Sequence, residues 1–210
     1  ILRKQNLEIR KGDRIGIVGG NGQGKTTLLK MIVGDEKLTE GSIDIAPGCV
    51  IGYFHQDHAT LDFEKNPVQQ IEALRPDLTY GEVRGALGRF QFKSEQVKSK
   101  LKDLSGGERA RVALLKLLLE DNNLLLMDEP TNHLDMESKD TLEEALNGYE
   151  GSLVTVSHDR WFLDQVVNTI WELQDGKVTV YRGNYTDYVR AKKGLPPLVD
   201  GEIHNPDDED

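Results

Sequence analysis

One short stretch of the sequence carries the residue types that hold phosphate groups. Residues 19–26 read GGNGQGKT and satisfy the pattern G-x-x-x-x-G-K-[ST], between an apolar run and a segment with helical spacing. Glycines let backbone N–H groups converge on phosphate oxygens, a lysine neutralises phosphate charge, and a threonine hydroxyl binds Mg²⁺. The stretch predicts a site for a nucleoside triphosphate and Mg²⁺, with an ordinary glycine-rich turn as the alternative. The candidate ligand-binding residues are Gly19, Gly20, Asn21, Gly22, Gln23, Gly24, Lys25, Thr26 and Thr27.

Two adjacent carboxylates follow an apolar run later in the chain. Residues 124–127 are apolar and lead directly into Asp128 and Glu129. The carboxyl ends of buried strands are where open α/β sheets bind ligands. We therefore expect Asp128 to bind Mg²⁺ and Glu129 to polarise the water that attacks the γ-phosphorus. Acids that merely end a strand are the alternative interpretation, which the neighbouring glycine-lysine loop makes much weaker.

The segment LSGGE at 104–108 introduces an amphipathic helix. Ser105 and Glu108 form an S-x-x-E capping box, which is a sufficient structural reason for both residues. Such a cap leaves further N–H groups at the helix start for an anion, so capping and phosphate binding are compatible. The residues alone leave the choice open. The candidate ligand contacts are Ser105, Gly106, Gly107 and Glu108.

These groups need a sheet to position them, and the hydrophobic pattern predicts one. Residues 14–18 form a short apolar run, and the apolar residues after Lys25 recur at helical spacing until Gly34. Continuous apolar runs at 124–127 and 153–156 are typical of strands covered on both faces in a parallel sheet. The remaining predicted elements are strands at 42–46, 50–54, 169–174 and 177–182, with turns at Pro47–Gly48 and Asp175–Gly176, and helices at 137–147 and after Asn184.

Residues 65–120 are predicted to form an inserted helical lobe. Asn66 before Pro67 and Thr79 with Glu82 are helix-start signals, and the region contains no convincing long strand. The predicted fold class is α/β, a P-loop NTPase (RecA-like) core with a mixed sheet, an antiparallel β edge and this helical lobe. The predicted nucleotide-binding domain spans 1–194, with its core at 1–64 and 121–194, and an acidic, disordered tail follows at 195–210.

Composition bounds the class of protein. The formal net charge of −10 includes six carboxylates in the tail, so residues 1–194 carry −4. That balance gives no electrostatic case for unselective nucleic-acid binding, although it leaves room for local basic patches. The single cysteine, Cys49, excludes an internal disulfide, and no apolar run approaches the roughly 20 residues that span a bilayer. We therefore expect a cytoplasmic location without membrane insertion.

The motifs, taken in chain order, resemble those of the ATP-binding cassette superfamily over nearly the whole chain. The resemblance implies that Gln56 is the lid-loop glutamine near Mg²⁺ and the attacking water, and that His158 is the switch histidine at the γ-phosphate. It also implies that Asp135 crosses to a partner cassette and that the LSGGE segment grips ATP bound to that partner. The motifs are Gln56 after a strand, LSGGE at 104–108, MDEP at 127–130, NHLD at 132–135 and SHD at 157–159.

Three longer stretches look like the ABC-F subfamily, whose members are soluble tandem cassettes that serve as translation and ribosome-protection factors. Only 47 residues separate Gln56 from Leu104, which is too few for the long helical arm usual in the first cassette of that family. The resemblance therefore implies a second cassette, with the first cassette and the ribosome as partners. The stretches are MDEPTNHLD at 127–135, SHDRWFLD at 157–164 and GNYTDY at 183–188.

Two other functions share most of these residues. The ATPase subunit of a membrane transporter would keep every catalytic residue, and a nucleotide-gated binding module would bind ATP with negligible turnover. One departure from the family also bears on affinity, because residues 1–18 lack the aromatic side chain that stacks on adenine. We expect the chain, which opens with Ile1, to be a piece of a longer protein and to bind ATP more weakly than the whole.

Overall fold

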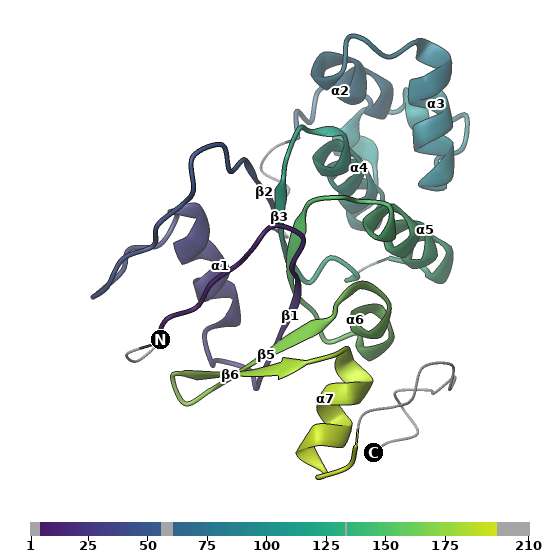
Figure 1. The fold of residues 1–210 in the computed structure, drawn as a ribbon. Coiled ribbons are helices and arrows are strands. Elements are labelled where there is room, and N and C mark those ends of the chain that lie inside the picture. Colours follow the sequence, from purple (N-terminus) through teal and green to yellow (C-terminus); the bar gives the residue numbers. More distant parts are fainter. Residues whose placement is uncertain (1–4, 56–60, 133, 197–210) are drawn as a thin grey trace.

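The computed structural model describes residues 5–55, 61–132 and 134–196 (Figure 1). The described strands form one sheet in the order β2-β3-β4-β1-β5-β6. Neighbours are parallel from β2 through to β5, and β6 is antiparallel to β5, which confirms the mixed sheet and its antiparallel edge. The strands are β1 (Arg14–Val18), β2 (Ile51–Phe54), β3 (Leu124–Asp128), β4 (Ser152–Val156), β5 (Thr169–Gln174) and β6 (Lys177–Arg182).

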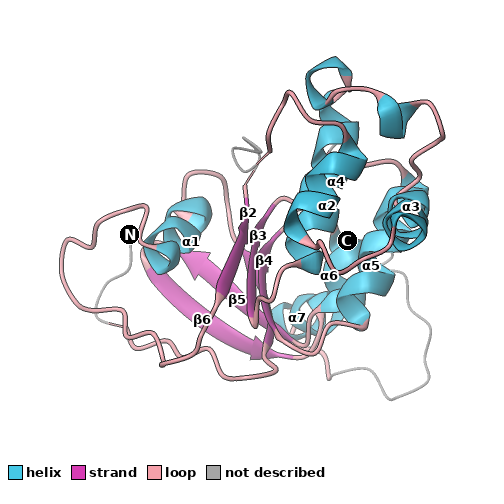
Figure 2. Cartoon of the chain, turned by 90° about the horizontal axis from the view of Figure 1, so that it is seen from above, coloured by secondary structure: helices cyan, strands magenta, loops and turns pink. Residues whose placement is uncertain are grey.

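Helices cover both faces of this sheet (Figure 2). Because successive strand residues point to opposite faces, Leu126 joins the core on the side of α1 while Leu125 and Met127 join the core on the other side. All three side chains are completely buried. The covering helices are α1 (Lys25–Val33) on one face and α4 (Gly106–Leu119), α5 (Met136–Asn147) and α6 (Arg160–Val166) on the other. The apolar runs at 124–127 and 153–156 are therefore continuous because both faces of these strands are buried, as predicted.

The predicted βαβ unit is β3, α5 and β4. The two strands are parallel neighbours, with Leu126 opposite Val154, and α5 crosses over between them. A crossover of this kind brings the carboxyl ends of both strands to the same edge of the sheet. The residues that follow β3 and β4 are therefore placed together.

The helical region between β2 and β3 begins as the cap signals predict. Asn66 and Thr79 each accept a hydrogen bond from the backbone N–H three residues on, in two complete capping boxes. The elements there are α2 (Pro67–Leu74), α3 (Tyr80–Arg89), the 3-10 helices η1 (Gln96–Lys98) and η2 (Leu101–Asp103), and α4, and no strand occurs in the described residues 61–123. The last helix, α7 (Tyr185–Lys192), follows Asn184 as expected.

The predicted strand at 42–46 is wrong. Residues 35–50 contain neither helix nor strand, although Cys49 N donates to Ala46 O across the expected turn, where Gly48 has a φ of 83°. Ile43 and Ile45 remain 38% and 51% exposed. An isolated pair of strands is only marginally stable in water, so an alternating pattern without a neighbouring strand and a buried face does not suffice.

Three of the sequence-based interpretations fall outside the described residues. They concern Gln56, His133 within the NHLD motif, and the acidic tail from residue 197 onwards.

Candidate nucleotide-binding site

The loops that follow β1, β3 and β4 enclose an open cleft of about 390 Å³ at the carboxyl edge of the sheet. The glycine-lysine loop comes from β1, the acid pair from β3 and His158 from β4. These groups lie as far as 139 positions apart in the sequence, and the parallel sheet brings them together. The cleft is lined by Asn21, Gly22, Gly24, Lys25, Thr26, Thr27, Asp128, Glu129, Asn132, Val156 and His158.

The start of α1 is suited to binding an anion. Each of the other described α-helices has a side chain that accepts a hydrogen bond from its first turn, whereas the N-cap of α1, Gly24, has none. Gly24 adopts the left-handed conformation with φ 99°, and Gly22 has a φ of 77°. The unsatisfied N–H groups and the positive end of the helix dipole therefore face the cleft without competition from a cap.

Lys25 is held inside the loop rather than extended into solvent. Its side chain is buried, and its Nζ donates to the carbonyl oxygens of Gly19 at 2.7 Å and Gly20 at 3.2 Å. A buried ammonium requires partners, and here backbone carbonyls supply them. Since Lys25 also lines the cleft, its charge is placed beside the position that phosphate groups would take.

The acid pair occupies two different environments. Asp128 is the last residue of β3 and is buried. Glu129 has a φ of 51°, a left-handed conformation that costs a non-glycine residue roughly 1–2 kcal/mol. Its backbone N–H donates to Val156 O at 2.8 Å, which fixes the turn. Strain of this kind is retained where the surrounding structure and the site require it.

Glu129 and His158 contact one another across the cleft. The Glu129 carboxylate accepts a hydrogen bond from the His158 backbone N–H at 3.2 Å, and its other oxygen lies 3.4 Å from His158 Nε2. Burial raises the pKa of Glu129, and the charge of Asp128 adds to this, while His158 and Lys25 oppose it. The carboxyl group is thus less acidic than usual, which suits a group that accepts a proton or polarises water.

The donor set of the cleft fits Mg²⁺. Thr26 contributes a hydroxyl and Asp128 a carboxylate, and hard oxygen donors are what this ion prefers. In the described part of the chain no group of three or more His, Cys, Asp or Glu side chains could hold a metal by itself. A site with few protein ligands is typical of Mg²⁺ that is bound together with substrate phosphates.

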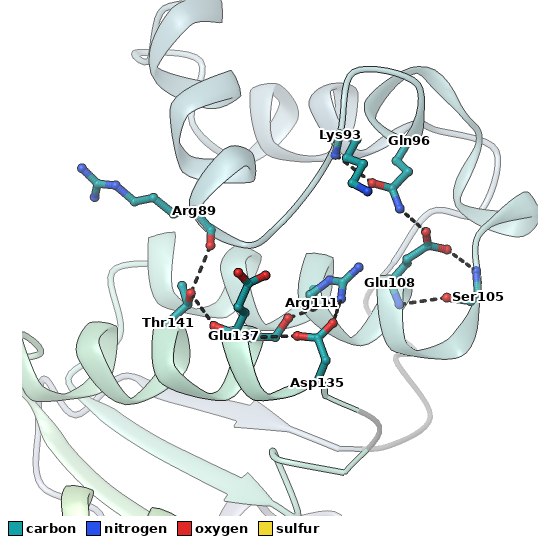
Figure 3. Close-up of polar contacts among 10 residues, drawn as sticks. Arg89, Lys93, Gln96, Ser105, Glu108, Arg111, Asp135, Glu137 and Thr141 are labelled. Carbon is teal, nitrogen blue, oxygen red and sulfur yellow. Dashed lines mark hydrogen bonds and ion pairs between the residues drawn. The ribbon is translucent and has the colours of Figure 1, made fainter.

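The LSGGE segment lies apart from this cleft. Ser105 caps α4, its Oγ accepting from Glu108 N at 3.3 Å while Glu108 Oε2 accepts from Ser105 N at 2.6 Å (Figure 3). None of the residues from Ser105 to Glu108 lines the cleft. The capping box is therefore confirmed, and a ligand at this helix start would have to be held by something other than the chain's own glycine-lysine loop.

Asp135 is also outside the cleft and is already engaged. It caps α5, because its Oδ1 accepts from Ser138 N at 2.8 Å, and its Oδ2 pairs with Arg111 Nη1 of α4 at 3.1 Å (Figure 3). The hydrogen bonds from Ser138 are the main cause that lowers the pKa of Asp135, and the charge of Arg111 adds to it. The pair joins the helix that follows LSGGE to the helix that follows the acid pair.

Two features were not predicted. Asn132 lines the cleft, and its backbone N–H donates to Glu129 O at 3.2 Å. Asn132 follows Glu129 by three residues, and this short spacing was the only sequence signal for its place in the cleft. In the sequence it stood out only as part of the NHLD motif. The second is a contact of Gln23, a predicted ligand residue, whose side chain accepts a hydrogen bond from Asp175 N at 2.9 Å and so connects the loop to the β5–β6 turn.

Together, the parallel sheet, the uncapped helix start and the adjacent acids define a nucleotide-binding domain of the P-loop class. A protein-family model described as "ABC transporter" matches residues 2–132. The chain belongs to this family, and it is an ATPase domain of the ATP-binding cassette type.

The relatives of the chain include members of the F subfamily. The chain is 42% identical over 191 residues to ABC transporter F family member 5 of Arabidopsis thaliana, covering 90% of this chain and 28% of the relative. It is 40% identical over 193 residues to the energy-dependent translational throttle protein EttA of Haemophilus influenzae, covering 90% and 35%. The chain thus spans about a third or less of the length of these relatives.

Solved structures agree on the fold. A dimeric ATP-binding cassette in a post-hydrolysis state, bound to ADP and Pi, matches with a TM-score of 0.70 and 25% identity, covering 86% of this chain and 90% of that one. An ATP-binding subunit of an ABC transporter matches with a TM-score of 0.76 and 20% identity, over 94% and 88%. Among the described helices, none has the length and apolar character needed to cross a bilayer.

Proposed function

We propose that this chain binds and hydrolyses ATP as an ABC-F type cassette that acts on the ribosome, working as a nucleotide-driven clamp with a second cassette. The observation that carries the proposal is the cleft where Lys25, Asp128, Glu129 and His158 meet beside an uncapped helix start. The relative named as a translational throttle supports the assignment to translation. The protein acts in the cytoplasm as the second cassette of a tandem pair.

Phosphate binding is the task of the loop from Gly19 to Thr27. Backbone N–H groups at the start of α1 donate to phosphate oxygens, and Lys25 exchanges one of its carbonyl partners for the β- and γ-phosphates. Thr26 and Asp128 hold Mg²⁺, with Gln56 near it by resemblance. The ion neutralises charge on the phosphates, and the carboxylate and hydroxyl are the groups this chain contributes to it.

Hydrolysis is assigned to Glu129. Its carboxylate orients and polarises a water molecule towards the γ-phosphorus, and its raised pKa suits a proton acceptor. His158 lies 3.4 Å from Glu129 and also lines the cleft, so it is placed to donate to the γ-phosphate. Ordered groups that are held before the substrate arrives reduce the reorganisation that the reaction requires.

The site is incomplete without a partner. Ser105, Gly106 and Gly107 start α4 away from the chain's own cleft, so in this proposal they grip ATP held by another cassette, with Asp135 crossing towards it. We assign residues 1–64 and 121–194 to the ATP-binding core and 65–120 to the helical lobe that carries this segment. Closure of two such faces over ATP, and reopening after hydrolysis, is the clamp.

The test compares Glu129→Gln with the unchanged chain and with Glu137→Gln, an exposed glutamate on α5. Glu129→Gln should keep Mg-ATP binding but release phosphate at least about a hundredfold more slowly, since a general base typically contributes 10²–10⁴-fold. Glu137→Gln should leave both unchanged. Phosphate release by Glu129→Gln at the unchanged rate would refute the assignment.

A second measurement separates the rival functions. The Glu129→Gln variant should co-sediment with ribosomes more strongly in the presence of ATP than in the presence of ADP. A chain that pellets with ribosomes on ATP binding yet shows no phosphate release in either form would be a binding module rather than an ATPase. Recovery only with detergent-solubilised membrane proteins would instead support the transporter subunit.

A further inference from the structure

Basic residues that are exposed or half-buried follow one another along one stretch of the helical region. Between Arg84 and Lys102 the chain has six basic residues and one acidic residue, Glu95, although the whole chain carries −10. Four of these six basic residues form what we call the basic belt. They lie on α3, in the turn that follows it and in η1. The basic belt consists of Arg84, Arg89, Lys93 and Lys98.

No acidic side chain in the described part of the protein neutralises the charges of the basic belt. Lys100 and Lys102 both pair with Glu64, at 2.9 and 3.0 Å, and are therefore left out of the belt. Within residues 5–55, 61–132 and 134–196, no salt bridge joins a belt residue to an acidic side chain. Arg84 Nη2 donates only to the neutral Ser94 Oγ, at 3.4 Å. Three exposed cations and the half-buried Arg84 thus have no acidic partner among the described residues of an otherwise acidic protein.

The backbone beneath the basic belt is firmly held. Thr141 Oγ1 donates to Arg89 O at 3.1 Å and so fixes the end of α3 to α5, and Gln96 Oε1 accepts from Lys93 N at 2.7 Å (Figure 3). The intervening apolar side chains point inwards, Phe92 being 6% and Val97 1% exposed. Figure 3 shows the Arg89 side chain extending away from the polar network. The belt is therefore an ordered surface and not a solvated tail.

We propose that the basic belt binds the phosphodiester backbone of RNA. This deepens the proposed function and rests on it, since RNA is the ribosomal component with the complementary charge. Arginine and lysine side chains without acidic partners match the charge of a chain of phosphates, which supply most of the affinity in such contacts. From residue 84 to residue 102 no large apolar side chain is exposed, and the nearest one is Tyr80, 59% exposed, one turn before Arg84 on α3. The belt itself is therefore dominated by charge and lacks the broad apolar face that enters a bilayer.

The test measures binding of a fluorescent 20-base-pair RNA duplex to the chain across a series of salt concentrations. The belt variant is Arg89→Gln/Lys93→Gln/Lys98→Gln. The control is Lys11→Gln/Lys37→Gln/Lys177→Gln, which removes the same charge from exposed positions elsewhere. The belt variant should bind at least about tenfold more weakly and lower the slope of log K against log salt by about two, because each lost phosphate contact contributes about 0.7–0.9. The control should stay within about twofold of the unchanged chain.

Several results would overturn the proposal. Equal losses in the belt and control variants would indicate net charge alone, and equally good displacement of the duplex by polyglutamate would indicate no preference for phosphate. Loss of binding to phosphatidylserine vesicles with RNA binding intact would assign the belt to a membrane. Phosphate release without RNA, and thermal unfolding, should be unchanged in the belt variant, so a failure here is distinguishable from failure of the ATPase assignment.

Discussion

Gly19 is the residue at which the glycine-lysine loop tolerates no side chain. Its φ is 148°, and a Cβ built there would collide with the carbonyl oxygen of Leu173 on β5. A backbone carbonyl in a sheet cannot move aside cheaply. We expect Gly19→Ala to lower the free energy of unfolding by about 2 kcal/mol or more, from positive-φ strain plus the clash.

Urea unfolding measures this effect, and Gly85→Ala on α3 is the matched control. A Cβ at Gly85 meets nothing within 4 Å, and alanine is favoured over glycine inside a helix, so this variant should gain about 0.5–1 kcal/mol. Gly19→Ala with unchanged stability would mean that the loop adjusts freely, and the close approach to β5 would then lack structural importance.

Glu143 on α5 provides a pH-dependent prediction. Burial raises its pKa to about 6, and Asp140 and Asp159 add to the shift while Lys139 opposes it. Because the folded-state pKa exceeds the unfolded one, the charged form destabilises the fold above about pH 6, and the effect vanishes below about pH 4.5. Glu143→Gln should therefore stabilise the chain at pH 7.5 by at most about 1 kcal/mol after allowing for solvent screening, and hardly at all at pH 4.5.

Thermal unfolding at the two pH values checks this expectation, with Glu144→Gln, an exposed neighbour, as the control. A gain from Glu143→Gln that is equal at both pH values would contradict an electrostatic origin.

Sequence patterns singled out the individual residues whose chemistry few other side chains can supply. Lys25, Asp128 and Glu129 were recognisable because few residue types can hold phosphate, bind Mg²⁺ or polarise water. The place of Asn132 in the cleft and the hydrogen bond between Gln23 and the β5–β6 turn were not predicted. A side-chain amide serves equally well in a loop, a helix cap or a binding site. Only the fold decides between such uses.

Among the secondary-structure elements, the central strands were predictable because they are buried on both faces. The strand predicted at 42–46 was wrong. Its alternation of Ile43 and Ile45 with polar residues is a strand pattern, but no ladder forms and both side chains remain exposed. Periodicity reports which residues could share a face. It does not report whether a neighbouring strand is present to pair with them.

The predicted capping box at the start of α4 is extended by a hydrogen bond from Gln96 that the sequence did not suggest. Gln96 Nε2 donates to Glu108 Oε1, and the other Glu108 oxygen accepts from Ser105 N (Figure 3). Gln96→Glu would place two carboxylates together and misplace Ser105. We expect about fivefold slower phosphate release at saturating ATP, the value of roughly one hydrogen bond, with unchanged affinity of the chain's own cleft for ATP.

The exchange variant Gln96→Glu/Glu108→Gln is the decisive control. A glutamine at 108 keeps the capping box and can donate to a carboxylate at 96, so the rate should recover. If the exchange variant is as slow as Gln96→Glu, the bridge does not position Ser105.

LSGGE lies apart from the chain's own cleft, and in the proposed clamp each site is therefore completed by a second cassette. ATP at a thousand times its dissociation constant, bound only to the closed pair, favours closure by about 4 kcal/mol. For this chain alone the second face must come from another copy. Phosphate release per chain should therefore rise with protein concentration.

Complementation between two inactive chains tests that arrangement directly. Lys25→Ala removes the ammonium proposed to bind phosphate but keeps LSGGE intact, whereas Ser105→Arg blocks the start of α4 and keeps the cleft intact. Each variant alone should release almost no phosphate. Mixed in equal amounts they should recover up to about a quarter of the unchanged activity, since random pairing makes half of the dimers mixed and each has one complete site. A mixture no more active than the sum of its components would place catalysis within a single chain, and the clamp would have to be rejected.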